Sequence, residues 1–206
     1  MAAESTHAHD ANTPLEYSKG EDRMTILGFW IFLGAEIALF STLFATYMVL
    51  HSRPANGPTS ADLFKPEIVL IMTFLLLTSS FTGSMAIHYL RAQKMKAMVT
   101  WLLITMALGL GFLGCEIFEF YEYIGHEGVS IKTSAFLSAF FVLVGTHGLH
   151  VTVGIGWLTC ILIQLKQRGF TPKTARKVFI IGLYWHFLDI VWLFIFTLVY
   201  LSGMVL

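Results

Sequence analysis

The sequence predicts an all-α, polytopic membrane protein: a bundle of five transmembrane helices, with the N-terminus in the cytoplasm and the C-terminus outside. Of the 206 residues, 56% are hydrophobic and 13% are charged, about half of the roughly 25% charged residues of a soluble domain. Five segments are long enough to cross a bilayer almost without charge, and the basic residues fall unequally on the two sides of them. This composition argues against a soluble enzyme, a disordered chain and a nucleic-acid-binding protein.

The five spans are located by the stretches of the sequence that carry few or no charges. A helix needs about 20 mainly apolar residues to cross the hydrocarbon core. The stretches that meet this length lie at about 26–50, 67–90, 97–119, 134–165 and 178–203. No apolar segment with a cleavage site precedes the first span, so no signal peptide is expected. We therefore expect a polar cytoplasmic tail over 1–23 and a single transmembrane domain over 24–206.

The basic residues set the predicted orientation. Ten lie on the side of the N-terminus: Lys19, Arg23, Arg91, Lys94, Lys96, Lys166, Arg168, Lys173, Arg176 and Lys177. Three lie on the other side: Arg53, Lys65 and Lys132. Because cytoplasmic loops carry the excess of Lys and Arg, the N-terminus is placed in the cytoplasm. Gly169, followed closely by Pro172, is expected to end the fourth helix.

Five ionisable side chains lie within the first, fourth and last spans, and all are expected near the middle of the membrane: Glu36, His147, His150, His186 and Asp189. Ionisable groups in hydrocarbon are costly and often mark functional sites. A metal site, a haem site, a proton relay or a lipid headgroup site would use them. The alternative is interhelical hydrogen bonding, in which each His is satisfied by a neighbour and the acids are protonated.

Two cofactor hypotheses can be weighed by motif and spacing. A metal site is disfavoured because the five spans contain neither a His-Glu-x-x-His motif nor a Glu-x-x-His pair. A bis-histidine haem would need two His residues on facing helices at matching depth. Either His147 or His150 could meet this requirement with His186, so spacing leaves the haem hypothesis open.

The end of the third span carries an acidic face and a run of glycines. Glu116, Glu119 and Glu122 recur every three residues and would line one side of the helix. A proton-entry or cation site would fit this pattern, but a solvated helix end is the preferred interpretation.

The preceding Gly-x-Gly-x-x-Gly at 109–114 lies inside a span, so we expect it to permit close helix packing rather than to bind a nucleotide.

Four segments resemble subunit III of the haem–copper oxidases. They are "LGFWIFLGAEIALFSTLFATY" (27–47), "GCEIFEFYEY" (114–123), "SAFFVLVGTHGLHVTVG" (138–154) and "YWHFLDIVWLFIFTLVYL" (184–201). These motifs follow the family's order. The chain resembles the last five of the seven helices of the mitochondrial type, a shortened form that looks like the subunit III of bacterial quinol oxidases. Within the quinol oxidases, "LGAEIALFSTLFATY" (33–47), "MTFLLLTSSFTG" (72–83) and "ILIQLKQRGFTP" (161–172) look closest to the Gram-positive aa-type menaquinol oxidases.

The resemblance implies a non-catalytic role in a complex of the bacterial plasma membrane. Subunit I of such an oxidase holds the haems, the copper and the proton pathways, and reduces oxygen to water while protons are pumped. Subunit III packs on subunit I beside subunit II and a small subunit IV, binds phospholipid and supports stability. It has also been linked to oxygen access and proton uptake. Five-helix members also occur in cytochrome c oxidases, so quinol and cytochrome c both remain as electron donors.

The resemblance also assigns family positions to the intramembrane residues. Glu36 takes the position of the membrane carboxylate that reacts with carbodiimides in the family. The other four, His147, His150, His186 and Asp189, are signature polar residues of the last two helices. This implies no catalytic, cofactor-binding or metal residue in the chain, and no nucleic-acid partner.

Two functions of another class are also considered. One is a bis-histidine haem anchor for a membrane dehydrogenase. The other is an independent proton or ion transporter that uses Glu36 and Asp189. Transporters are commonly built from inverted repeats with broken helices, and the sequence shows neither.

Overall fold

The computed structural model describes residues 20–51, 66–125 and 134–205 of the chain, and these residues form helices, with short connections at 92–94 and 169–171 and no strand among them. The helices are α1 (Gly20–Leu50), α3 (Pro66–Arg91), α4 (Met95–Gly125), α5 (Ala135–Arg168) and α6 (Pro172–Ile195). Helix α6 continues through a π-helical segment, η2 (Phe196–Leu201), into the short α7 (Ser202–Val205). Five helices in this part of the chain are long and apolar enough to cross a membrane, as predicted.

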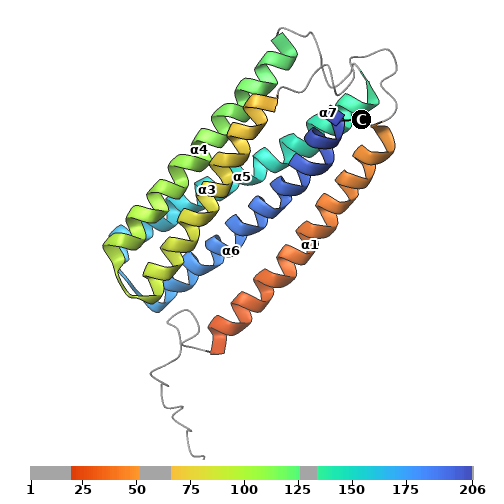
Figure 1. Cartoon of the computed structure of the whole chain (residues 1–206). Helices are drawn as coiled ribbons and strands as arrows, with labels where there is room; N and C mark the ends of the chain where they lie inside the picture. The colour runs from red at the N-terminus through yellow and green to blue at the C-terminus, as the bar shows by residue number, and fades with distance from the viewer. Residues whose placement is uncertain (1–19, 52–65, 126–133, 206) are drawn as a thin grey trace, which may run out of the picture.

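Helix α6 occupies the centre of the bundle (Figure 1). It contacts α1, α3 and α5, while α3 and α4 pack side by side along their length (Figure 1). Helix α1 lies at the edge and makes its main contacts with α5 and α6. In agreement with these positions, the α6 span is the most buried of the five and the α1 span is the least buried.

The turn between α5 and α6 is fixed by local sequence. Gly169 has φ +68° and its N–H bonds to the carbonyl of Leu165, so the prediction that this glycine ends the fourth helix is confirmed. Thr171 caps α6 through a capping box with Thr174, and Pro172 takes the first helical position. The chain therefore reverses direction within three residues, which brings α5 and α6 together.

The helices are longer than the predicted spans. The third helix extends over Met95–Gly125 instead of 97–119, and the last one begins at Pro172 instead of 178. The weakly charged stretch of a span marks only the part of the helix that lies in the hydrocarbon core. Capping and backbone hydrogen bonds allow the helix itself to extend further at both ends. The predicted orientation rests partly on Lys19, Arg53, Lys65 and Lys132, which lie outside the described residues, and it stays a prediction.

Glycines permit close approach of helices at defined points, as predicted for the 109–114 segment. A Cβ at Gly109 of α4 would lie 2.7 Å from Cη2 of Trp185 on α6. A Cβ at Gly182 of α6 would lie 2.6 Å from Cδ1 of Ile87 on α3. Gly114, in contrast, has open space at its Cβ position. Of the three glycines in this segment, packing therefore requires Gly109, whereas Gly111 makes ordinary contacts and Gly114 none.

Candidate functional site

The five predicted intramembrane residues do not form one cluster. They separate into a pair between α1 and α5, a single histidine in the core, and a group between α6 and α3. The pair is Glu36 with His150, the single histidine is His147, and the group contains His186 and Asp189. Each of the three places has its own chemistry.

Glu36 and His150 join α1 to α5. Nε2 of His150 lies 3.1 Å from Oε2 of Glu36, so this pair fits the interhelical hydrogen-bonding alternative. Nδ1 of His150 lies 2.7 Å from the carbonyl oxygen of Thr146. A carbonyl only accepts, so Nδ1 carries the ring proton and donates it there. In a neutral pair, the carboxylic acid of Glu36 then donates to Nε2.

His147 lies at the centre of the bundle. Its ring is fully buried and packs against the rings of Phe40, Phe112 and Trp192, at centroid distances of 6.4, 5.8 and 5.5 Å. Among the described residues, neither of its ring nitrogens has a hydrogen-bond partner. The alternative in which each His is satisfied by a neighbour therefore does not describe His147, which is packed as an aromatic core residue.

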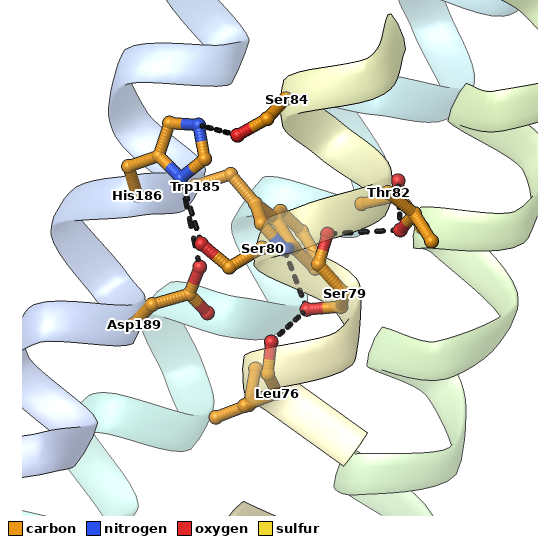
Figure 2. A network of polar contacts seen from close by, with 9 residues as sticks. Leu76, Ser79, Ser80, Thr82, Ser84, Trp185, His186 and Asp189 are labelled. Atoms are coloured by element: carbon orange, nitrogen blue, oxygen red, sulfur yellow. Dashed lines mark hydrogen bonds and ion pairs between the residues drawn. The ribbon is translucent and has the colours of Figure 1, made fainter. Parts of the chain in front are cut away.

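His186 joins α6 to α3 (Figure 2). Its Nδ1 lies 2.9 Å from Oγ of Ser80, and its Nε2 lies 3.3 Å from Oγ of Ser84. Oδ2 of Asp189, one turn further along α6, lies 3.9 Å from the same Nδ1. Figure 2 shows both serines on α3 pointing toward the imidazole. Sequence reasoning missed Ser80 and Ser84, although an uncharged span rich in hydroxyl residues was a signal for interhelical hydrogen bonds.

Two tryptophans extend this α3–α6 contact. Nε1 of Trp185 donates to Oγ of Ser79 at 3.0 Å, and Nε1 of Trp192 donates to Oγ1 of Thr73 at 3.1 Å. All four side chains are buried. In membranes, interhelical hydrogen bonds contribute about 0.6–2 kcal/mol each. The two indoles thus fix the register of α6 against α3 along two turns.

The acidic face of α4 is largely buried, which corrects the expectation of a solvated helix end. Glu116 and Glu119 are 4% and 2% exposed, and Glu122 is half-buried. Glu119 accepts hydrogen bonds from the hydroxyls of Tyr123 (2.7 Å) and Tyr200 (3.0 Å). Because helix α4 continues to Gly125, these carboxyls lie within the helix and not at its end.

Glu116 packs directly on the backbone of α5. Its carboxyl occupies the position that a Cβ of Gly148 would take. Oε2 of Glu116 is buried and has no hydrogen-bond partner within the described ranges. The glycine of the "HGLH" segment therefore makes room for a carboxyl from the neighbouring helix.

The described side chains also bear on the cofactor hypotheses. No group of three or more His, Cys, Asp or Glu residues that could hold a metal ion occurs among residues 20–51, 66–125 and 134–205. The ring of His147 packs on Trp192 of α6, so side chains fill the space between α5 and α6 that a haem held by His147 and His186 would need. The arrangement favours helix packing over haem ligation.

A groove of about 660 Å³ lies between α1 and α6. Its walls are mainly aromatic and aliphatic, and they include Trp30, Phe40 and Phe44 of α1 and Ile190 and Phe194 of α6. Gly34 and Ser41 of α1 and His186 of α6 also line it. It is partly open to the outer surface of the bundle.

Comparison with known proteins gives a consistent result over nearly the whole chain. Residues 11–204 match the family model of cytochrome c oxidase subunit III. The chain is 60% identical over 195 residues to quinol oxidase subunit 3 of Bacillus subtilis, covering 95% of both proteins. It is 51% identical over 199 residues to the probable quinol oxidase subunit 3 of Staphylococcus saprophyticus, covering 96% of this chain and 98% of the relative.

Proposed function

The chain belongs to the cytochrome c oxidase subunit III family, and we propose that it is the structural subunit III of a respiratory quinol oxidase, with no catalytic centre of its own. The prediction from the sequence motifs is confirmed: the chain is a haem–copper oxidase subunit III, and it is a multi-pass bacterial membrane protein with five helices long and apolar enough to span a membrane among its described residues. Quinol is proposed as the electron donor because relatives that match over 95% and 98% of their length are named quinol oxidase subunits.

The observation that carries the structural role is how the intramembrane polar groups are used. Glu36 with His150 joins α1 to α5, His186 with two serines joins α6 to α3, and Glu119 with Tyr200 joins α4 to η2. Each contact ties a different pair of elements. Ionisable side chains used in this way stabilise one arrangement of helices that a partner subunit can recognise.

The proposed division of labour follows from membership of a multi-subunit oxidase. Subunit I would hold the haems and copper, oxidise quinol, reduce oxygen to water and pump protons. This chain would pack on subunit I beside subunit II and a small subunit IV, bind membrane lipid and keep the complex stable during turnover. Its N-terminus would lie in the cytoplasm. Much of its outer surface is apolar, which suits contact with lipid and with other membrane subunits.

The experiment compares the purified oxidase with and without this chain. We expect both preparations to show the same haem spectrum and similar initial rates of quinol oxidation, and the preparation without the chain to lose activity faster during turnover. The chain purified alone should show no haem absorption. Haem bound to the isolated chain, or proton flux through it in liposomes, would contradict the proposal and favour the anchor or the transporter.

A further inference from the structure

The groove between α1 and α6 combines an apolar body with hydrogen-bonding groups deep inside the membrane. His186 lines it directly, and Ser84, on the neighbouring α3, is exposed and hydrogen-bonded to the same imidazole. Ser41 lines the opposite wall. A pocket with apolar walls and a few converging polar groups is the usual form of a small-molecule site, and about 300–1,000 Å³ is the usual size.

The hydrogen-bonding pattern leaves one acceptor on the α1 wall of the groove, at Ser41, and one beside the groove, at Ser84 next to the lining residue His186. A neutral imidazole has one N–H and one acceptor nitrogen. The carboxyl of Asp189 near Nδ1 of His186 favours the proton on that nitrogen. Ser84 then donates to Nε2, and its oxygen keeps lone pairs. Ser41 donates to the carbonyl of Ile37 at 2.7 Å and keeps its lone pairs in the same way. A ligand that matches this site brings hydroxyl donors.

The depth of these groups separates the ligand classes. Ser84 precedes Arg91 by seven residues and His186 follows Lys177 by nine, the nearest Lys or Arg on their helices on that side. At a rise of about 1.5 Å per residue, both groups lie roughly 10–14 Å from the charged helix ends. A phospholipid keeps its headgroup at the interface and offers only acyl chain at this depth, which leaves polar groups facing hydrocarbon. A hydroquinone with an isoprenoid tail carries its hydroxyls into the hydrocarbon.

Resting on the proposed function, we infer that the α1–α6 groove is a binding site for the isoprenoid quinol itself, separate from the redox centres of the complex. The quinol ring lies at the depth of His186 with a hydroxyl donating to Ser84, and the tail follows Phe44, Ile190 and Phe194. The lining consists of apolar side chains with a few hydrogen-bonding groups, and the quinol binds and leaves without a change of redox state. The site holds substrate within the complex between turnovers.

The test is photolabelling of the whole purified oxidase in nanodiscs. The probe is an azido-substituted isoprenoid naphthoquinone, reduced to the quinol before illumination, and labelled peptides are identified by mass spectrometry. Gly34→Leu fills the groove without strain, because nothing lies within 4 Å of the Gly34 Cβ position. Gly28→Leu is the matched control: it lies on the same helix with equally open space but does not line the groove. Ser84→Ala removes the proposed acceptor.

We expect labelled α1 and α6 peptides in the wild type and in Gly28→Leu. Labelling of these peptides should fall about tenfold in Gly34→Leu through steric exclusion, and roughly fivefold in Ser84→Ala through loss of one hydrogen bond. Labelling of the other subunits should not change. Excess unlabelled quinone should compete for the site, and excess phospholipid should not.

Three results would overturn the inference: no label in this chain, a label indifferent to Gly34→Leu, or displacement by phospholipid as effective as by quinone, which would identify an acyl-chain site. The same preparations report on the proposed function independently through their quinol oxidase activity. An active complex without label in this chain refutes the groove site alone. A complex that contains this chain and does not oxidise quinol refutes the proposed function.

Discussion

Replacement of Glu36 tests the proposed structural role most directly. In Glu36→Ala, Nε2 of His150 loses its partner, while Nδ1 stays bonded to the Thr146 carbonyl. Leaving a buried acceptor unsatisfied costs about 1–3 kcal/mol in proteins, and interhelical hydrogen bonds in membranes average about 0.6 kcal/mol. Because both side chains are 15–18% exposed, a loss of about 1 kcal/mol is expected. Glu36→Gln keeps a donor for Nε2 and should lose little.

The assay follows the intact oxidase through sustained quinol oxidation. We expect both variants to assemble with wild-type haem spectra and with initial rates within about twofold of wild type. Inactivation during turnover should be about fivefold faster in Glu36→Ala, the factor that about 1 kcal/mol corresponds to, and nearly unchanged in Glu36→Gln. In a double-mutant cycle, Glu36→Ala should add little to His150→Phe, because both remove the same contact.

Two outcomes would refute this reasoning. Immediate loss of all turnover in Glu36→Ala, with intact haems, would place the carboxyl on an obligatory proton path. Equal inactivation of the Ala and Gln variants would show that the hydrogen bond to His150 is not what Glu36 contributes.

Two further substitutions test the packing of the bundle. Gly109→Ala should destabilise the chain by about 2–3 kcal/mol in detergent unfolding, because the new Cβ meets the buried ring of Trp185 at 2.7 Å. The control is Gly114→Ala on the same helix, which has open space around it and should change stability by less than about 1 kcal/mol. Equal effects of the two substitutions would contradict the contact between Gly109 and Trp185. Tyr200→Phe removes a buried hydroxyl that donates to the carboxyl of Glu119 at 3.0 Å, and it should lower the free energy of unfolding by about 1–2 kcal/mol in the same measurement. The control is Tyr121→Phe, at a 70% exposed position, which should be neutral. A neutral Tyr200→Phe would show that the hydrogen bond contributes nothing to stability.

The sequence sufficed for the number of spans and for the helix stop at Gly169. These features depend on local properties, namely the length of an uncharged run and the conformational preference of one residue. It also sufficed to single out Glu36 as an ionisable residue inside a span, while leaving open what that carboxyl contacts. The helices continue past the predicted spans, because caps such as Thr171 allow a helix to begin outside the uncharged stretch.

The partners of the polar side chains could not be predicted in the same way. Spacing placed His147 and His150 on one helix but did not indicate that one would bond to Glu36 and the other would enter an aromatic core. Likewise, the burial of Glu119 depends on Tyr200, 81 residues away. Which residue a helix face meets depends on the packing of the whole bundle, and one sequence states only that some partner is needed.

The distinction between closed and open polar contacts connects the structural role with the proposed quinol site. Glu119 is sealed by its two tyrosines, and His147 is enclosed by rings, so neither offers a group to a ligand. The cluster around His186 both joins α6 to α3 and borders a groove of about 660 Å³. Its imidazole side chain is 31% exposed at a depth where lipid provides no hydrogen-bond partner. A contact needed only for helix packing gains nothing from this exposure, and so this cluster, rather than the more buried carboxyls, is where a membrane-dissolved hydroxyl donor is expected to bind.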